Sequence, residues 1–485
     1  MKTEPSATGP WPSLLAGTLI IAAILRVYGL QSGLWFDEIV TLVESARLPL
    51  SRILTEFPGV NAHPFYSVLA HASIALFGDS SWALRLPAGV FGVATVWMVY
   101  VLGSRMIGRL EAWAGALVLA TSYHHIWFSQ NARGYTMLGF FALLSTYYLL
   151  RAGESARRRD YVFYALASAA GIYTHLTMAF IVAGQAAALV AARMLGWRQA
   201  VGLRWADLMW AWVGALLLSA IAYAPFAGTL VAHFGAEAPR KAAKVATGGW
   251  AIAEALRSML SGAGVPATIL GSVVAVIGGF SLLRRAPFWI ALLVTPAVVT
   301  VVGIVGLGQP LRPRFFFFLA GAAAICLGHG VGVLARAFGR RSAGGAAVSV
   351  PVVLACTFVL VAASAVALPR NYTVPKQDFE GAVKFLEREE AGGVRVAAAG
   401  LACMPVDTYF LKQWPCLKSP ADLDALTAAS PRALVVYTLA DYMDDPDLRD
   451  RLRAGCAPVR TLPATLGGGE MIVCDPHRQA GQVRP

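Results

Sequence analysis

The chain has 485 residues, of which 57% are hydrophobic and 14% are charged, and its formal net charge at pH 7 is +13. A water-soluble domain of this length cannot bury so much apolar surface, whereas a polytopic membrane protein exposes it to lipid. The positive charges lie in short loops between apolar runs, a pattern that sets membrane topology and argues against nucleic acid as a partner.

Apolar runs of roughly 17–22 residues predict about eleven membrane-spanning helices. The first run has no convincing small-residue cleavage site, so we interpret it as a membrane anchor and not as a cleaved signal peptide. The runs lie near residues 13–30, 84–103, 111–128, 134–151, 160–175, 176–195, 207–228, 266–283, 287–307, 315–335 and 346–368.

The charges between the runs predict the orientation in the membrane. With a cytoplasmic N-terminus every inside loop is basic, as the positive-inside rule requires. An odd number of spans then places residues 369–485 outside. The inside loops carry Arg105 and Arg109; Arg151, Arg157, Arg158 and Arg159; Arg193, Arg198 and Arg204; Arg284 and Arg285; and Arg336, Arg340 and Arg341.

Residues 369–485 differ in composition from the rest and predict a small α/β domain. The periodicity predicts helices over 378–390 and 446–454 and strands over 394–399 and 433–439. Two further segments, 459–462 and 470–474, are predicted to pair as strands around Gly467–Gly469.

The same region contains Cys403, Cys416, Cys456 and Cys474. Four cysteines in an extracytoplasmic domain favour two disulfides. Three pairings are possible, and the simplest joins Cys403 to Cys416 and Cys456 to Cys474.

The first outer loop, residues 31–83, begins with an acidic pair, Asp37 and Glu38, directly after the first span. Carboxylates at a membrane surface are costly unless they are hydrogen-bonded or bind a metal, and one of them can deprotonate an acceptor hydroxyl. The alternative is a helix cap, in which Asp37 starts an interfacial helix over 38–46.

Basic candidates lie on the same outer side. Arg133 lies in the second outer turn, His175 in the third, and Arg314 at the start of the tenth span, while His63 precedes Pro64 in the first loop. Arginines at outer helix ends can hold a lipid phosphate through paired hydrogen bonds. The alternatives are a turn role for His63 and snorkelling of the arginines to the membrane surface. Acid, histidine and arginine candidates thus converge on one face of the membrane.

Four ordered motifs carry a resemblance to a known family. They are Trp35–Glu38, the run from His63 to Pro87, Ile126–Tyr135 and Tyr173–His175. Together they resemble the GT-C fold glycosyltransferases of the dolichyl-phosphate-mannose protein mannosyltransferase and aminoarabinose transferase type, in particular the glycosyltransferase family 39-like branch of bacteria.

The resemblance implies the GT-C fold, with a catalytic first outer loop at 31–83 packed over the spans. Together with the composition and the charge pattern, it predicts a polytopic α-helical GT-C domain over 1–368, followed by an extracytoplasmic α/β domain at 369–485. It implies inverting transfer of a hexose or pentose from a polyprenyl-phosphate donor on the outer face of a bacterial cytoplasmic membrane. Asp37 matches the aspartate base of the family and Glu38 the second acid of its pair. Arg133 and Arg314 fall where basic residues engage the donor phosphate.

Two positions depart from the pattern, because the family commonly has glutamate where Asn131 stands and a second proline where Phe65 follows His63 and Pro64. His63 and His175 remain candidates for binding substrate or metal. A divalent metal between Glu38 and His63 is one option, although the sequence requires no cofactor. The acceptor can be a glycan, a lipid or a protein.

Two functions of other classes stay open at this point. One is a flippase or transporter of lipid-linked sugars, which would need polar residues at mid-membrane depth. The other is a non-catalytic membrane scaffold that acts through residues 369–485.

Overall fold

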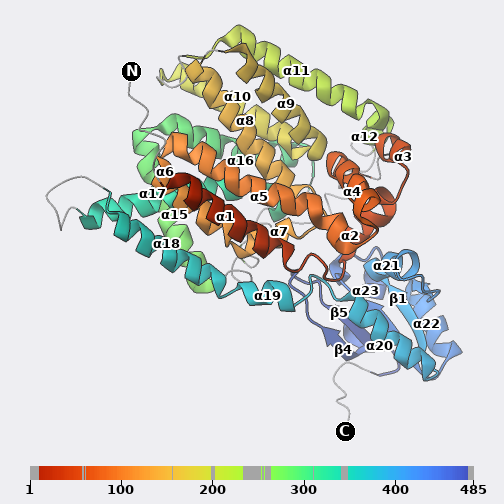
Figure 1. The fold of residues 1–485 in the computed structure, drawn as a ribbon. Coiled ribbons are helices and arrows are strands. Elements are labelled where there is room, and N and C mark those ends of the chain that lie inside the picture. Colours follow the sequence, from red (N-terminus) through yellow and green to blue (C-terminus); the bar gives the residue numbers. More distant parts are fainter. Residues whose placement is uncertain are drawn as a thin grey trace. The chain divides into compact units, whose positions relative to one another are not determined.

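The computed structural model describes residues 10–478 except 57–58, 60–61, 156, 198–201, 310, 340–347 and, within 233–263, all but 253 and 256. Its contacts divide the chain into two compact units (Figure 1). The helical unit comprises Met1–Leu30, Pro49–Gly78 and Ala83–Leu368, and the α/β unit comprises Gln31–Leu48, Asp79–Trp82 and Pro369–Pro485. Arg198, Arg340 and Arg341, which belong to the predicted inside loops, lie outside the described residues.

Each predicted apolar run coincides with a helix in the described part of the chain. These helices are α1 (Trp11–Val27), α5 (Ser81–Met106), α6 (Arg109–Ala120), α8 (Tyr135–Ser155), α9 (Arg158–Thr174), α10 (Thr177–Met194), α11 (Trp205–Tyr223), α15 (Val265–Arg285), α16 (Pro287–Gly306), α17 (Leu319–Gly339) and α18 (Val350–Ala365). Shorter elements of the helical unit are α3 (Leu50–Thr55), α4 (Pro64–Phe77), α7 (Tyr123–Ser129), η3 (Ala224–Phe226), α12 (Ala227–Ala232) and η5 (Pro313–Phe316).

Seven helical segments among the described residues are long and apolar enough to cross a membrane. The remaining helices at predicted runs, α1, α6, α8 and α9, do not meet both conditions. The seven segments are Ser81–Met106, Thr177–Met194, Trp205–Ala232, Val265–Arg285, Pro287–Gly306, Leu319–Phe338 and Val350–Thr373. Their number makes the chain a multi-pass membrane protein.

The predicted span at 111–128 is not one continuous helix, which corrects the sequence interpretation. Helix α6 ends at Ala120, and α7 begins at Tyr123 after its capping residue Ser122, whose hydroxyl accepts a hydrogen bond from the His125 amide. The guanidinium of Arg26 donates to the Ala120 carbonyl at 3.0 Å, so the carbonyl exposed by the break is satisfied inside the protein.

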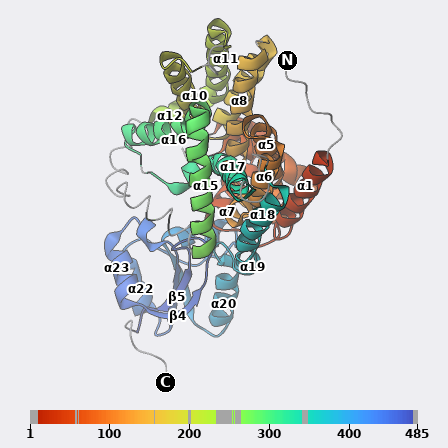
Figure 2. The same ribbon diagram turned by 90° about the vertical axis from the view of Figure 1, so that its left-hand side faces the viewer.

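Helix α17 packs closely against both α6 and α15, and the three helices are neighbours in Figures 1 and 2. A Cβ atom at Gly115 would lie 2.3 Å from the Ala324 carbonyl oxygen, and one at Gly278 would lie 1.8 Å from that of Cys326. Small residues permit such backbone contact between membrane helices, and polar side chains often hold them together. Here the buried Glu111 of α6 pairs with His329 Nδ1 at 2.6 Å and with Arg336.

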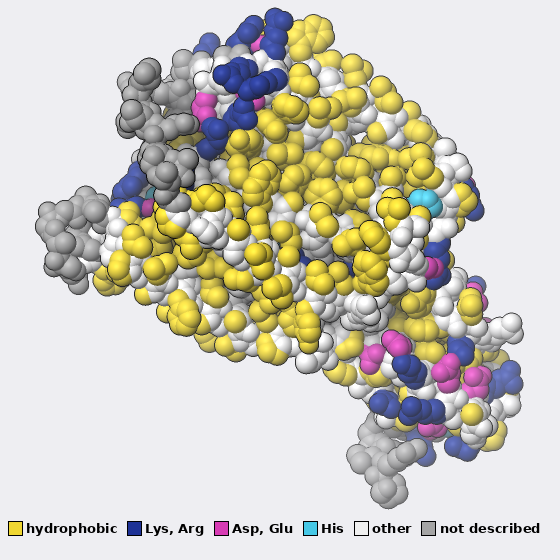
Figure 3. All heavy atoms as spheres, viewed as in Figure 1, with side chains coloured by type: hydrophobic (Ala, Val, Ile, Leu, Met, Phe, Trp, Pro, Cys, Tyr) yellow, Lys and Arg dark blue, Asp and Glu magenta, His cyan; other side chains and the backbone are white. Residues whose placement is uncertain are grey.

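The surface of the helical unit in Figure 3 is a broad field of hydrophobic side chains, and its charged side chains gather near one end of the helices. Many apolar residues there are exposed, including Leu216, Ile221 and Phe358. This distribution is that of a protein whose solvent is lipid.

The α/β unit is built on a five-stranded sheet with the order β2-β1-β3-β5-β4. Strands β2, β1 and β3 are parallel, whereas β5 is antiparallel to β3 and β4. The strands are β1 (Arg395–Ala399), β2 (Cys416–Leu417), β3 (Ala433–Tyr437), β4 (Ala457–Leu462) and β5 (Met471–Asp475). The helices are α2 (Phe36–Thr41), η1 (Leu42–Ala46), α19 (Leu368–Thr373), α20 (Phe379–Ala391), η6 (Gly400–Ala402), α21 (Cys403–Thr408), α22 (Pro420–Ala429), η7 (Ala440–Tyr442) and α23 (Pro446–Gly455).

Most of the elements predicted after residue 369 are confirmed. The predicted helices correspond to α20 and α23, the two predicted strands to β1 and β3, and the predicted hairpin to β4 and β5. The prediction missed α22, whose start is a capping box in which Ser419 and Asp422 exchange hydrogen bonds.

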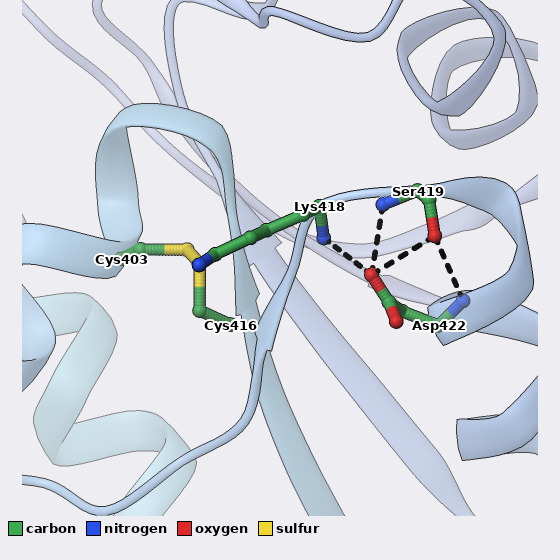
Figure 4. Close-up of a disulfide and its surroundings, with 5 residues drawn as sticks. All are labelled: Cys403, Cys416, Lys418, Ser419 and Asp422. Carbon is green, nitrogen blue, oxygen red and sulfur yellow. Dashed lines mark hydrogen bonds between the residues drawn. A yellow bond between two sulfur atoms is a disulfide. The ribbon is translucent and has the colours of Figure 1, made fainter.

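Both disulfides have the simplest of the three possible pairings, Cys403–Cys416 and Cys456–Cys474. The first joins the start of α21 to β2 and lies next to the capping box of α22 (Figure 4). A hydrogen bond from the Lys418 amide, with two more from the hydroxyl and the amide of Ser419, holds the pKa of the Asp422 carboxyl below its usual value.

Candidate functional site

The acidic pair lies on α2, near the start of a short helical segment of the α/β unit. Trp35 is the N-cap residue, and its amide donates to the Glu38 carboxylate at 3.3 Å. The carboxylate that caps the helix is therefore that of Glu38, and Asp37 is not the N-cap residue that the alternative interpretation required. Both acids are buried, with exposed fractions of 7% for Asp37 and 0% for Glu38.

The helix predicted over 38–46 begins earlier and changes its geometry. It comprises α2 and then η1, a single turn of π-helix over Leu42–Ala46. Such π turns are rare and are often found at functional sites, because the extra residue changes the direction of the side chains that follow.

The basic candidates form one cluster in the helical unit, which we call the basic cluster: His63, Arg133, Tyr135, His175 and Arg314. They come from four separate segments, namely the N-cap of α4, the α7–α8 turn with the start of α8, the α9–α10 turn, and η5. The His63 and His175 ring centroids are 4.9 Å apart, and the Tyr135 ring lies 5.1 Å from that of His63 and 5.8 Å from that of His175.

The charges of the cluster are uniformly positive. Burial, the charge of Arg133, the charge of His175 and the charge of Arg314 hold the pKa of His63 well below its usual range, against a smaller opposing effect of the Thr174 main chain. Burial and the same two arginines lower the pKa of His175 to about 3. Both imidazoles are therefore neutral at pH 7, and the net charge comes from the guanidinium groups.

Hydrogen bonding decides which nitrogen of His175 carries the proton. Its Nδ1 accepts from the Thr177 amide at 3.1 Å. In the neutral ring the proton is then on Nε2, which is a hydrogen-bond donor.

The hydroxyl of Tyr135, which is 1% exposed, has no hydrogen-bond partner among the described residues. Buried polar atoms without partners are rare in native proteins.

A glycine gives the cluster its close packing. A Cβ atom at Gly134 would lie 2.8 Å from Thr174 Cγ2 and 3.1 Å from His63 Nδ1. Thr174 is fully buried, and its hydroxyl donates to the Ala170 carbonyl at 2.8 Å, which fixes the side chain. Only glycine fits at this position without a shift of its neighbours.

A network of buried polar side chains connects the turn that carries Arg133 to α1. Arg26 of α1 bonds Ser129 Oγ at 3.2 Å and His125 Nδ1 at 2.7 Å. Gln130 donates to the carbonyls at the end of α1, the closest being that of Tyr28 at 2.6 Å. These hydrogen bonds tie the turn to the end of α1 and restrict the movement of Arg133.

The structure thus brings together four of the candidates predicted from the sequence, and it places the other two, Asp37 and Glu38, in the α/β unit. Sequence reasoning did not assign Tyr135 or Thr174 to the site, although both belong to motifs that it recognised. Among the described residues, no group of three or more His, Cys, Asp or Glu side chains is placed to hold a metal ion.

Comparison with known proteins gives a family model in sequence and similar folds in structure. Residues 61–228, which are less than half of the chain, match the family model described as dolichyl-phosphate-mannose-protein mannosyltransferase. In sequence, no curated protein matches the chain.

The fold is similar to solved structures of low sequence identity. One is ArnT from Cupriavidus metallidurans bound to undecaprenyl phosphate, with 14% identity and a TM-score of 0.56 over 99% of this chain and 100% of that chain. Another is the archaeal oligosaccharyltransferase AglB from Archaeoglobus fulgidus in complex with an inhibitory peptide and a dolichol-phosphate, with 12% identity and a TM-score of 0.54 over 95% of this chain and 74% of that chain.

The chain is therefore a multi-pass membrane protein with the GT-C fold of membrane glycosyltransferases. The resemblance seen in its motifs is confirmed at the level of the fold.

Proposed function

We propose that this protein transfers a sugar from a polyprenyl-phosphate donor to an acceptor hydroxyl at the outer face of a bacterial cytoplasmic membrane, with inversion at the anomeric carbon. The observation that carries the proposal is the basic cluster, which gathers the buried Arg133, the partly buried Arg314 and two neutral, buried imidazoles. Undecaprenyl phosphate in the structure of ArnT, a protein of the same fold, supports a lipid phosphate as the ligand.

In this proposal the cluster binds the phosphate of the donor. The guanidinium groups of Arg133 and Arg314 supply the opposite charge, and His175 Nε2–H and the Tyr135 hydroxyl are further donors. A preorganised set of donors stabilises charge most strongly where water is scarce. The phosphate gains negative charge as the sugar departs, so the cluster favours the transition state over the intact donor.

Asp37 is the proposed base. The acceptor oxygen attacks the anomeric carbon as its proton passes to the Asp37 carboxylate. The bond between the anomeric carbon and the phosphate oxygen breaks, and the lipid phosphate leaves with the electron pair. Glu38 is satisfied at the cap of α2 and holds the helix that carries the base.

Lipid binding tests the phosphate site. Wild-type protein and the variant Arg314→Gln are titrated with undecaprenyl phosphate in detergent. Loss of a charge-assisted hydrogen bond costs about 1.5–3 kcal/mol, so we expect an affinity roughly 10- to 150-fold lower. Arg312→Gln is the matched control in the same turn, because both imidazoles sense the charge of Arg314 and not that of Arg312. Equal effects of the two substitutions would contradict the assignment.

Transfer tests the base. Membranes that contain equal amounts of wild type and Asp37→Asn are supplied with radiolabelled undecaprenyl-phosphate sugars, and label in the envelope glycans, lipids and proteins is measured. We expect a loss of at least a hundredfold, since a general base contributes about 10²–10⁴. Turnover near that of the wild type would exclude Asp37. Mass analysis of the same fractions, with and without the protein, identifies sugar and acceptor.

A further inference from the structure

The sheet of the α/β unit has a topological switch point. The chain leaves β1 toward β2 at one edge of the sheet, and it leaves β3 toward β4 at the opposite edge. In parallel α/β sheets, ligands bind outside the carboxyl ends of the strands where the connections diverge in this way. In this unit that place is next to the ends of β1 and β3.

The backbone at this place has an unusual conformation on both strands. Gly400, directly after β1, has φ +58°, and Leu439, two residues after β3, has φ +46°. Between β3 and Leu439 lies Thr438, which is fully buried. A Cβ atom at Gly400 would lie 2.8 Å from Met443 Cγ, so the segment after β1 packs tightly against the segment after β3.

A segment of the same chain reaches the strand end through a glutamine. Gln377 Nε2 donates to Thr438 Oγ1 at 3.0 Å, and Gln377 Oε1 accepts from the Phe36 amide at 3.0 Å. Thr438 in turn donates to the Gly469 carbonyl at 3.2 Å. The chain of hydrogen bonds therefore runs from the end of β3 to the first residue of α2, the residue before Asp37.

Gln377 is well placed to hold this position. It is 1% exposed, and a Cβ atom at Gly469 would lie 3.1 Å from its Cγ, so the β4–β5 turn confines the side chain. The first amides of a helix have no partner inside the helix. The side chain of Gln377 accepts the hydrogen bond of the Phe36 amide, and the carboxylate of Glu38 accepts that of the Trp35 amide.

Contacts at both ends of residues 31–48 fix the segment to the same unit. At one end, a Cβ atom at Gly33 would lie 3.4 Å from the Glu380 carboxylate. At the other end, the Arg47 guanidinium lies 5.8 Å from the centroid of the Tyr409 ring and pairs with Asp79 at 2.7 Å.

We propose that Gln377 is a positioning residue, through which the switch point of the α/β unit holds α2 and orients the carboxylate of Asp37 for proton transfer. The C-terminal residues are then part of the catalytic apparatus. This inference rests on the proposed function, in which Asp37 is the base.

The test uses the full-length protein and the variant Gln377→Met, which keeps the volume of the side chain and removes both hydrogen bonds. We expect kcat to fall at least tenfold, the donor KM to stay within twofold, and amide exchange over residues 36–41 to become at least tenfold faster. Gln377→Glu keeps an acceptor for the Phe36 amide, so it should restore most of kcat. Gln413→Met, at an exposed glutamine of the same unit, should match the wild type.

The two readouts separate the possible failures. Unchanged exchange over residues 36–41 in Gln377→Met would overturn the proposal, and so would faster exchange with normal kcat. A parallel loss of kcat and of folded protein in both Gln377 variants would reduce Gln377 to a structural residue. If wild-type protein transfers no sugar from undecaprenyl phosphate, the proposed function fails, and the exchange rates still decide whether Gln377 anchors α2.

Discussion

Gly134→Ala is a small perturbation that tests the basic cluster through its packing. The added Cβ would lie 2.8 Å from Thr174 Cγ2, whereas carbon atoms in contact prefer about 3.5–4.0 Å. Thr174 cannot move away easily, because it is buried and hydrogen-bonded to the Ala170 carbonyl. Much of the displacement then falls on His63, whose Nδ1 lies 3.1 Å from the new atom.

The expected magnitude follows from the usual cost of overpacking, about 1–3 kcal/mol. If the substitution destabilises the lipid-bound conformation of the cluster by this amount, the affinity for undecaprenyl phosphate falls roughly 5- to 150-fold. The assay is the same titration in detergent, with thermal unfolding measured in parallel to separate loss of binding from loss of fold.

Gly139→Ala is the matched control in the following helix. Its Cβ would meet Thr95 Cγ2 at 3.9 Å and the Phe318 Cα at 4.0 Å, both ordinary contacts. Alanine also favours the helix by about 1 kcal/mol over glycine, so this variant should bind normally and unfold at the same or a higher temperature. Equal binding by the two variants would show either that His63 is not closely packed against Gly134 or that the basic cluster does not hold the lipid phosphate.

Three further predictions concern stability. The pKa of His175 is about 3 in the folded protein and 6.5 in the unfolded chain, so its contribution to stability is complete above pH 6.5 and is lost as the pH falls. His175→Gln should therefore make the free energy of unfolding, measured by denaturant titration, less dependent on pH between 6.5 and 5. The difference in slope should be at most about 1.4 kcal/mol per pH unit. Replacing both Cys456 and Cys474 by serine opens a link across 18 residues and should destabilise the α/β unit by about 3 kcal/mol, measured as a lower denaturant midpoint; reduction of the wild type, which also opens Cys403–Cys416, should lower the midpoint at least as far. Glu111→Ala leaves Arg336 without its carboxylate in the helix interface and should cost about 3–5 kcal/mol, seen as a lower unfolding temperature, and an unchanged value would show that the ion pair is dispensable.

Local patterns were sufficient to predict most of the elements. Each apolar run is helical, since a stretch of lipid-compatible residues must satisfy its backbone hydrogen bonds internally, but the run at 111–128 is divided between α6 and α7. In the α/β unit, the alternation of apolar residues and the glycines at 467–469 predicted the β4–β5 hairpin. The break between α6 and α7 was missed, because the residue that satisfies it, Arg26, is far away in the sequence.

The candidate site was predictable in part. The motifs indicated His63, Arg133, His175 and Arg314 as basic residues of one face of the membrane, because topology alone decides the side on which a turn lies. Their assembly into one buried cluster with Tyr135 depends on how α4, α8, α10 and η5 pack, which no local pattern contains.

The sequence by itself determined that this chain spans a membrane many times, and it predicted which turns face outward and which residues bind phosphate or take a proton. Only the tertiary structure decided that the basic residues meet, that Glu38 and not Asp37 caps α2, and that the acidic segment at 31–48 belongs to the same unit as residues 369–485. The physical reason is that composition and periodicity act over a few turns of chain. The bond from the Phe36 amide to Gln377, by contrast, joins residues more than three hundred positions apart.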